Sequence, residues 1–458
     1  MTDATLRRGP IAVIGAGLAG LTAATTLVRR GFDVTVLESG AQIGGLAATH
    51  RDPDGFSYDV GAHFVTNRLA AALGSGAACR RVTRYGEAVL VRGRTYAYPF
   101  GLIAEPRYAA SALRAKLARP QTPLHAAEWF ERYVGRTFAR EIALPLVEAW
   151  SGLPAERLSP DIGATLPSTA HSLYLAIARR ITGRPVASGY SRTAPEGATV
   201  WHVYPKDGVA TLVRTLADRV PDRVELNSAL EKIVVEDGAV RAVIVRGERR
   251  DVSGVVSTLP LDVLATLVSG TDALEPLRQV RYRAMTFVSL RFAGANLLRD
   301  VVLWTPERRY DFFRLTEVPA AMPWLAPEGK TSVTADIGCD VGDAIWTTPD
   351  DVLAGLVLDQ IRDIVPGAAR RYLGAHVVRT RYAYPVFDLA YDAQRRAARR
   401  SLGVAGLLSV GRNGTFDHVF MEDVYWQTIA AAARFEPAQP GAETMRPQYA
   451  AGLTETTV

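Results

Sequence analysis

Lysine is scarce in this chain of 458 residues: four Lys stand among 53 basic residues, and the other 49 are Arg. Cysteine is scarcer still, because only Cys79 and Cys339 occur, and they lack the spacing of metal ligands. We expect both thiols to be unpaired in a reducing compartment. No run of about 18 apolar residues exists, so we expect no transmembrane helix. The start of the chain also lacks the apolar segment of a signal peptide. Together these absences predict a cytoplasmic protein.

The distribution of charge argues against a nucleic-acid-binding role. The formal net charge is +6, but the arginines are spread along the chain rather than gathered into a basic arm. No aromatic-rich RNA motif accompanies them. We therefore expect a small-molecule partner and no nucleic acid, and we predict no metal site. Hydrophobic residues make up 48% of the chain and charged residues 22%, as in globular proteins.

The stretch PIAVIGAGLAGLTAATTLVRRGFDVTVLES, near the start of the chain, has the pattern of a β-α-β unit. A short apolar run over 11–14 predicts a buried parallel strand, and apolar residues at helical spacing follow until Gly31. A second apolar strand over 34–37 ends at Glu38. This order is the context in which a glycine motif binds a dinucleotide. The alternative is a plain β-α-β unit whose glycine turn binds nothing.

Three glycines and one acid give this unit its predicted chemistry. Gly15 allows a tight turn, Gly17 lets the backbone approach a pyrophosphate, and Gly20 lets the helix pack closely on the strand. The helix N-terminus offers free N–H groups to the phosphates. The carboxylate of Glu38 is placed to accept hydrogen bonds from a ribose. It would also repel a 2′-phosphate, which disfavours NADP.

The residues after Glu38 favour FAD over NAD. A second glycine pair, Gly44 and Gly45, is followed by the hairpin-like segment RDPDGFSYDVG, which leads to His63. A NAD dehydrogenase normally continues with further strand–helix units here, whereas an extended segment suits a longer cofactor. The stretch resembles the flavin amine oxidase and protoporphyrinogen oxidase superfamily, which has UDP-galactopyranose mutase among its relatives. That resemblance implies FAD, and we expect it to be bound non-covalently.

Two distant segments support the resemblance. In VELNSALEKIVVEDGAVRAVIV, Asp237 and Gly238 form a hairpin signal between two β-rich runs. The resemblance places Leu230 at the adenine and returns the chain toward the cofactor at Thr258. The other segment is LLSVGRNGTFDHVFMEDVYWQTIAAAA, in which a strand, a tight turn and a helix starting near Met421 follow one another.

The last helix has a stated role in the family. The resemblance implies that its N-terminus faces the pyrimidine edge of the flavin, where partial positive charge stabilises the reduced cofactor. It places Arg412 at the pyrophosphate or the ribityl chain, and Glu422 stands where relatives usually carry Asp. The complete set of residues that we expect to contact FAD is Gly15, Gly17, Leu18, Ala19, Gly20, Glu38, Ser39, Gly44, Gly45, Leu46, Gly61, Ala62, His63, Leu230, Thr258, Gly411, Arg412, Met421, Glu422 and Val424.

These segments predict an α/β fold with a discontinuous Rossmann-type FAD-binding domain and an α+β substrate domain. The substrate domain combines an antiparallel sheet with a helical insertion, since the residues after 280 alternate at period two and the central stretch has helical periodicity. The predicted divisions are 1–105, 203–265 and 400–437 for FAD, 106–202 for the insertion, 266–399 for the substrate domain and 438–458 for a disordered tail.

Four residues are candidates for catalysis. His63 follows the extended segment and either contacts the flavin ring or packs against a backbone carbonyl. Tyr382 and Tyr384, in RYAYPVFDLAY, either line the active site or are aromatic residues of an edge strand. Asn413 flanks the flavin turn. Arg281 and Arg283 are further candidates, for an anionic substrate, with a solvated strand face as the alternative.

An absence bears on the reaction. Amine-oxidising relatives carry a Lys in the strand that here reads RAMTFVSLRF, and Phe287 takes its place; Leu46 likewise replaces an Arg. The resemblance therefore favours the protoporphyrinogen-oxidase-like and mutase-like branches. We predict an FAD-dependent oxidoreductase that moves hydride from a C–N, C–O or C–C bond to flavin N5. The alternatives are a non-redox sugar-nucleotide mutase that uses reduced flavin, and a non-catalytic FAD-binding protein.

Overall fold

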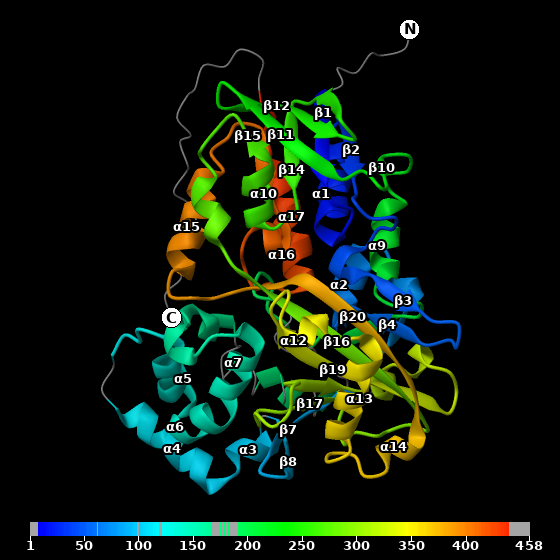
Figure 1. The fold of residues 1–458 in the computed structure, drawn as a ribbon, viewed down its shortest axis with the longest axis vertical. Coiled ribbons are helices and arrows are strands. Elements are labelled where there is room, and N and C mark those ends of the chain that lie inside the picture. The colour runs from blue at the N-terminus through cyan, green and yellow to red at the C-terminus, as the bar shows by residue number, and fades with distance from the viewer. Residues whose placement is uncertain are drawn as a thin grey trace.

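The chain is organised in two stacked parts, which Figure 1 shows with the longest axis vertical. The upper part holds a parallel sheet, and the lower part holds an antiparallel sheet flanked by helices. The predicted α/β fold class is confirmed. The computed structural model describes residues 8–61, 63–98, 100–118, 121–165, 174–175, 177–178, 181–183 and 191–438.

The parallel sheet is assembled from segments far apart in the sequence. Its five strands, in spatial order, are β10 (Val224–Glu225), β2 (Phe32–Leu37), β1 (Arg8–Ile14), β14 (Gly254–Ser257) and β21 (Leu407–Ser409). Every neighbouring pair is parallel. The segments 11–14, 34–37 and 407–409 therefore belong to one sheet, with β14 between β1 and β21. Their carboxyl ends share one edge, where ligands of such sheets bind.

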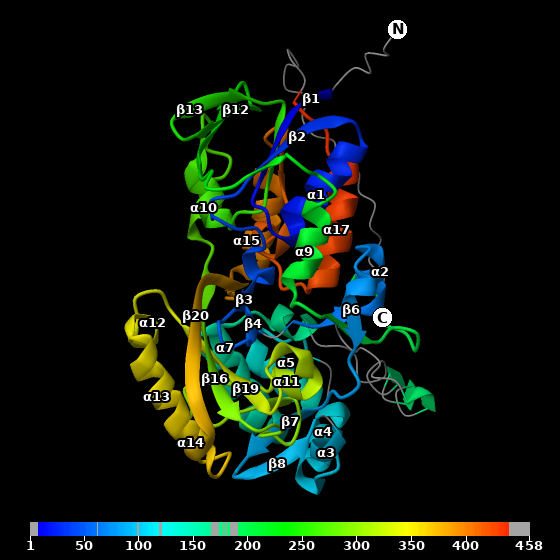
Figure 2. The ribbon, with the colours of Figure 1, turned by 90° about the vertical axis from the view of Figure 1, so that its right-hand side faces the viewer.

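Both faces of this sheet are covered, which explains its continuous apolar runs. Ile11 and Val13 pack into a cluster with the helices α1 (Leu18–Arg29), α9 (Ala210–Ala217) and α17 (Met421–Arg434). The intervening residues Ala12 and Ile14 belong to a second cluster, with α10 (Leu261–Leu267) and β12 (Ala239–Val245). Figure 2 shows the two layers on opposite sides of the sheet.

A small β sheet forms part of the second layer. Its strands are β13 (Glu248–Asp251), β12 (Ala239–Val245), β11 (Leu230–Glu236) and β15 (Val268–Ser269). The hairpin of β11 and β12 turns at Asp237 and Gly238, whose φ angles of 51° and 71° are both positive, as a type I′ turn requires. The hairpin predicted from the sequence is therefore present.

The lower part is built on a seven-stranded sheet. In spatial order its strands are β20 (Tyr372–Pro385), β16 (Tyr282–Ala293), β19 (Lys330–Cys339), β18 (Arg314–Thr316), β17 (Val302–Trp304), β7 (Glu87–Val91) and β8 (Arg94–Ala97). All pairs are antiparallel except β17 with β7. The sequence placed 87–97 in the FAD-binding segment 1–105, but these two strands extend the substrate sheet, because β7 pairs with β17 rather than with the parallel sheet.

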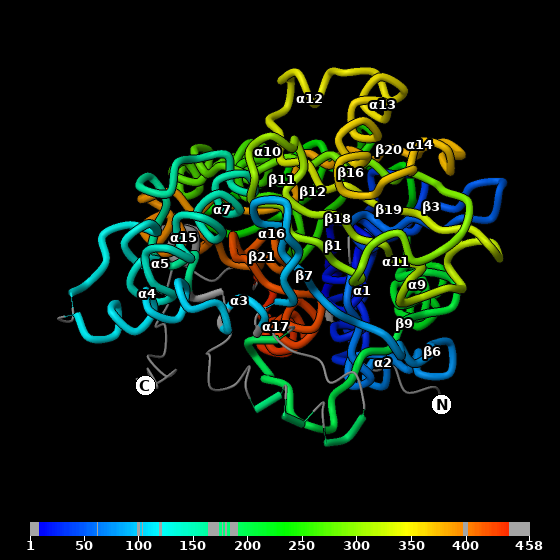
Figure 3. Tube along the Cα trace, turned by 90° about the horizontal axis from the view of Figure 1, so that it is seen from below, coloured from blue at the N-terminus to red at the C-terminus, as the bar shows by residue number. Residues whose placement is uncertain are grey.

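Helices cover this sheet on different sides (Figure 3). The helix α13 (Asp350–Ile361) packs on β16 and β20. The described part of the insertion contains the helices α4 (Pro106–Leu117), α5 (Ala126–Val134), α6 (Arg136–Phe138) and α7 (Leu144–Ser151), whereas residues 191–201 form no helix. Shorter helices are α2 (Asn67–Ala72), α3 (Phe100–Ile103), α11 (Val318–Ala321), α12 (Ala344–Thr347), α14 (Ala368–Arg371), α15 (Tyr391–Ser401) and α16 (Gly411–Gly414).

Three further observations complete the fold. Two short sheets, β3 (Thr49–Arg51) with β4 (Ser57–Asp59), and β5 (Val65–Thr66) with β9 (His202–Pro205) and β6 (Cys79–Arg81), connect the two parts. None of the described helices is long and apolar enough to cross a bilayer. Both cysteines are free thiols. Of the tail predicted over 438–458, only Ala438 is described, and it is buried with its N–H bonded to the Ser253 carbonyl, at 2.7 Å.

Candidate functional site

The glycine motif forms a tight cradle at the carboxyl edge of the parallel sheet. Gly15 has a φ of 98°. A Cβ on Gly20 would lie 1.8 Å from the Gly15 carbonyl oxygen, so only glycine allows α1 to approach the turn this closely. Gly17 is the N-cap of α1 and gives no side-chain cap, and no acid lies in the first turn. The first N–H groups of α1 are therefore free to hold an anion.

A second glycine loop lies against the first. The N–H of Gly44 donates to the Ala16 carbonyl at 3.0 Å, and Gly44 forms an isolated bridge with Gly17. A Cβ on Gly17 would meet the Gly44 carbonyl oxygen at 3.5 Å. Gly44 and Gly45 have φ angles of 133° and 54°, and Leu46 follows directly. The two loops thus surround the N-terminus of α1 with backbone rather than with side chains.

The predicted acid stands beside this cradle. One carboxylate oxygen of Glu38 accepts the Ala16 N–H at 2.8 Å, and the other accepts the Gly40 N–H at 2.8 Å and the Ser39 hydroxyl at 3.3 Å. The Glu38 carbonyl accepts the N–H of Ser228 at 2.7 Å. The segment that leads to Leu230 therefore lies beside Glu38, as an adenosine site requires.

Two other predicted residues close the cradle. The Thr258 hydroxyl donates to the Ile14 carbonyl at 2.7 Å, and a Cβ on Gly15 would collide with it at 2.3 Å. Gly411, with a φ of 83°, lies against Ala19 of α1, since a Cβ on Gly411 would be 2.9 Å from the Ala19 Cβ. Segments near residues 15, 40, 230, 258 and 411 therefore converge on one place.

Arg412 is a partly buried cation at this junction. Its Nε donates to the Val419 carbonyl at 3.0 Å and its Nη1 to the Ala383 carbonyl at 3.4 Å. No carboxylate of the described residues forms an ion pair with it, and burial lowers its pKa. A buried guanidinium without a counter-ion is costly unless an anion joins it. The cradle, the carboxylate and this unpaired cation together suit the phosphates of FAD.

The last helix begins at Met421, as the sequence predicted. The Glu422 side chain is almost fully buried and accepts hydrogen bonds from the Thr66 hydroxyl at 2.9 Å and from Arg68 Nε at 2.5 Å. In this structure its carboxylate ties α17 to the segment at 66–68 rather than standing free at the helix N-terminus. Val424 packs in the apolar cluster with α1. Contact of Met421, Glu422 and Val424 with FAD stays a prediction.

His63 lies in the segment that passes the cradle. Its Nε2 is 3.0 Å from the Val60 carbonyl, and it also interacts with the backbone of Leu46. Burial lowers the pKa of His63, and nearby Arg412 lowers it further. The ring is therefore neutral at pH 7. Gly61 has a φ of 80°, and Ala62, predicted to contact FAD, lies outside the described residues.

An aromatic cluster faces Arg412 from the substrate side. The guanidinium carbon of Arg412 is 5.4 Å from the centre of the Tyr384 ring. Tyr384 lies 5.2 Å from Trp150 and 5.4 Å from His418, ring centre to ring centre. His418 also meets Phe420 at 5.5 Å. Burial lowers the pKa of His418 well below its usual value, and its Nδ1 has no partner among the described residues.

The other two catalytic candidates lie apart from this cluster. The amide of Asn413 donates to the Tyr382 carbonyl at 3.0 Å, but the Tyr382 ring packs on Tyr282 at 5.5 Å and its hydroxyl bonds to Asp262. Tyr382 and Asn413 therefore brace the flavin turn against β20. Of the four candidates, His63 and Tyr384 are the ones whose described side chains interact with the guanidinium of Arg412.

Some site residues have no signal in the sequence. Trp150 comes from the helical insertion and packs on β20 only because α7 folds against the sheet.

Arg283, an anion-binding candidate, is instead paired with Asp340 at 2.7 Å and 8% exposed. Its guanidinium packs against Gly152 and Gly338. Such long-range neighbours are set by tertiary packing.

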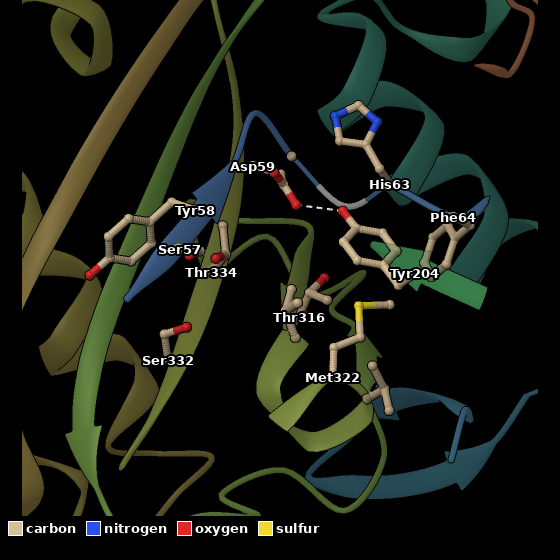
Figure 4. Close-up of a pocket in the computed structure, with 13 residues that line it drawn as sticks. Ser57, Tyr58, Asp59, His63, Phe64, Tyr204, Thr316, Met322, Ser332 and Thr334 are labelled. Atoms are coloured by element: carbon tan, nitrogen blue, oxygen red, sulfur yellow. Dashed lines mark hydrogen bonds between the residues drawn. The ribbon is translucent and has the colours of Figure 1, made fainter. Parts of the chain in front are cut away.

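A small cavity lies between the two parts of the molecule (Figure 4). It has a volume of about 20 Å³, enough for one water molecule. Asp59 and Tyr204 face each other across it and share a hydrogen bond, and the Thr316 hydroxyl on its wall has no partner. His63 and Gly61 also line it. This cavity therefore joins the flavin-side segment to the substrate sheet through polar groups.

The fold and the cradle define a Rossmann-type flavoprotein. The chain matches the flavin containing amine oxidoreductase family over residues 18–434, and it belongs to that family. Membership in a flavin-containing family confirms the predicted cofactor, FAD. The resemblance seen in the sequence is likewise confirmed.

Solved structures share this fold. Reduced UDP-galactopyranose mutase superposes with a TM-score of 0.76 and 19% identity over 93% of this chain and 95% of that one. Cyclohexylamine oxidase from Brevibacterium oxydans superposes with a TM-score of 0.67 and 16% identity over 93% and 98%. A protein assigned as a protoporphyrinogen oxidase, from Exiguobacterium sp. 255-15, gives 0.69 and 18% over 93% and 97%. Identities this low establish the fold alone.

A curated relative matches only a short stretch. Lysine-specific histone demethylase 1 homolog 3 of Arabidopsis thaliana is 50% identical over 56 residues. The match covers 12% of this chain and 3% of that protein. Within the described residues, no group of three or more His, Cys, Asp or Glu is placed to hold a metal ion.

Proposed function

We propose that the protein is an FAD-dependent oxidoreductase that dehydrogenates a C–N, C–O or C–C bond of a small organic substrate. The observation that carries this proposal is the junction at Arg412, where the FAD cradle meets an aromatic wall from the substrate sheet. Tyr384 and Trp150 supply that wall, and His418 lies within it. The flavin, when bound, supplies the hydride acceptor.

The chain's own residues have separate tasks in this proposal. Arg412 holds an oxyanion of the cofactor, because it has no protein counter-ion. His63 and His418 are neutral at pH 7, so either imidazole is able to accept a proton from a substrate held nearby. The aromatic rings exclude water from the reacting atoms. Asn413 and Tyr382 keep the flavin turn fixed against β20.

We also propose that the electron acceptor is a molecule other than O₂. Phe287 stands where the sequence comparison expects the lysine of amine oxidases. Its ring lies against Gly61, since a Cβ on that glycine would be 3.0 Å from the ring. An apolar ring there means that no charged side chain stands at the position of that lysine, which supports slow reaction with oxygen.

The second candidate function is a sugar-nucleotide mutase that works with reduced flavin. The observation in its favour is the pair of partly buried guanidiniums, Arg412 and Arg314, that flank Tyr384. Both interact with the Tyr384 side chain, and two arginines suit a diphosphate.

One anaerobic experiment separates the two functions. The oxidised, flavin-loaded protein is mixed with a panel of amines and alcohols while the flavin absorbance is followed. In parallel, the dithionite-reduced protein is incubated with UDP-galactopyranose, and the products are separated by chromatography. Bleaching by a panel member supports the oxidoreductase. Ring contraction of the sugar without net oxidation of the flavin would contradict it in favour of the mutase.

A further inference from the structure

A row of side chains crosses the substrate sheet on the face that meets the flavin-side segment. Paired positions on neighbouring strands place Phe287 opposite Asp336, Asp336 opposite Arg314, and Arg314 opposite Trp304. Directly opposed residues point to the same face of a sheet. Since the Phe287 ring lies against Gly61, this face looks toward the segment that carries His63.

Arg314 is held by two hydrogen bonds to Asp336, but one of its donor groups makes no hydrogen bond within the described residues. Its Nε donates to Asp336 Oδ2 at 3.0 Å, and its Nη2 donates to the same oxygen. Its guanidinium carbon stands 5.3 Å from the centre of the Trp304 ring. Nη1 makes no hydrogen bond within the described part of the chain, and the side chain keeps 13% of its surface exposed. One donor group of a fixed cation is therefore available.

Asp336, unlike Arg314, is almost completely buried, because its side chain is 1% exposed. Burial raises the pKa of its carboxyl, and the contact with Arg314 opposes that effect. An ion pair buried this deeply is rarely the most stable choice, since apolar residues of the same volume commonly do as well. The pair therefore has a role other than stability, which is to fix the orientation of the Arg314 guanidinium.

Arg283, on β16, provides the contrast. It also pairs with an acid, Asp340, but Gly152 and Gly338 press against its guanidinium. A Cβ on Gly152 would lie 2.6 Å from the Arg283 guanidinium carbon. Arg283 is therefore packed closely against backbone, whereas Arg314 packs against the Trp304 ring.

Arg314 shares its aromatic neighbours with the proposed active site, since it contacts Trp304 and interacts with Tyr384. Trp304 and Tyr384 pack on one apolar cluster, which includes Phe287. Trp304 Nε1 donates to Glu87 at 2.8 Å, and the neighbouring Tyr98 keeps 41% of its surface exposed. The exposed Tyr98 ring is therefore accessible to a ligand at this end of the sheet.

We propose that Arg314, aimed by Asp336 and Trp304, binds an oxyanion of the substrate, a carboxylate or a phosphate, at the end of the site remote from Arg412. This inference deepens the proposed function and depends on it. The free Nη1 supplies the charge-assisted hydrogen bond, and the Tyr98, Trp304 and Tyr384 rings surround the apolar body of the ligand. Asp336 and Trp304 are positioning residues, because they act through Arg314.

The test uses aromatic probes and the absorbance of the bound flavin. Flavin-loaded wild-type protein is titrated with benzoate, with phenyl phosphate and with benzyl alcohol, and the flavin difference spectrum is recorded. We expect an anionic probe to perturb the spectrum, and the two anions distinguish a carboxylate site from a phosphate site. In the double variant R314Q/D336N, which keeps the shape of the pair without its charges, the affinity for that anion falls about tenfold or more, while benzyl alcohol binds as before.

Three controls keep the outcome interpretable. The variant R283Q/D340N removes the other ion pair of this sheet and is expected to leave anion binding unchanged. Arg314→Lys retains the charge without the planar fork and is expected to restore part of the affinity. Retained flavin in every variant shows that the fold and the FAD site remain.

Several results would overturn the inference. It fails if neither anion perturbs the flavin of the wild type, or if R314Q/D336N binds the anion as tightly as the wild type does. It also fails if the double variant loses benzyl alcohol together with the anion, since that pattern shows general damage to the site. A wild-type protein that takes up no flavin contradicts the proposed function itself, which separates the two failures.

Discussion

The glycine cradle and the seven-stranded sheet bound the same site, but they are built on different principles. In the cradle the working groups are backbone N–H groups, and the residues that matter are those without a side chain, such as Gly17 and Gly20. In the sheet the working groups are side chains, such as Arg314 and Tyr384, brought together by strand pairing. The cofactor end is therefore fixed by backbone shape, and the substrate end is open to change by single substitutions.

Among the substitutions considered, we expect Gly20→Ala to have the largest effect, because it disrupts the glycine cradle. The new Cβ would lie 1.8 Å from the Gly15 carbonyl oxygen, so α1 must move away from the turn. We expect loss of bound FAD and a fall of about 3 kcal/mol in the free energy of unfolding, measured by urea titration. Gly355→Ala in α13 is the matched control, because nothing lies within 4 Å of its Cβ. FAD bound by the Gly20 variant as in the wild type would refute the cradle.

The next effect tests whether one side chain matters in the cradle. Glu38→Gln keeps the size of the residue but removes its charge, and with it an acceptor for the ribose. We expect the FAD dissociation constant to rise about tenfold or more, measured by flavin fluorescence quenching. Glu248→Gln, an exposed change on β13, is the control. An unchanged constant would mean that backbone contacts alone suffice.

A pH titration probes the junction between the two regions. Burial lowers the pKa values of His63, His376 and His418, so the folded protein binds fewer protons than the unfolded chain below pH 6.5. Their contribution to stability is present above pH 6.5 and is lost as the pH falls. Urea titrations from pH 7 to 5 should show a declining free energy of unfolding, by at most about 1.4 kcal/mol per pH unit for each histidine. His418→Phe should flatten that slope, and an identical slope would contradict the burial of His418.

The smallest expected effect lies outside both regions. Gly238 has a φ of 71° in the hairpin of β11 and β12, a conformation that costs an alanine about 1 kcal/mol. Gly238→Ala should lower the free energy of unfolding by that amount and leave FAD affinity unchanged. A change in FAD affinity would show that the hairpin communicates with the cradle.

The same comparison explains what the sequence was able to predict. The β-α-β unit, the Asp237–Gly238 turn and the start of α17 at Met421 depend on neighbours within a few residues, so local patterns predicted them. The predicted FAD segments also meet in the structure, since Ser228 binds Glu38 and Gly411 lies on Ala19.

Other features depend on partners that local patterns do not specify. The place of β7 and β8 follows from pairing with β17, more than 200 residues away. The position of Arg314 in the site depends on the register of β16, β19 and β18. The position of Trp150 depends on the packing of α7 against the sheet. The Glu422 carboxylate accepts a hydrogen bond from Arg68, 354 residues distant, a contact that no local pattern predicts.

The central claim is that FAD lies between the cradle and the sheet and undergoes redox chemistry there. The most direct measurement is photoreduction of the purified, flavin-loaded protein without air, followed by rapid mixing with oxygenated buffer or with an artificial electron acceptor. We predict about one FAD per chain, complete bleaching on photoreduction, and recovery that is faster with the artificial acceptor than with O₂. A protein that binds no flavin after incubation with FAD, or whose flavin resists reduction, would contradict the account.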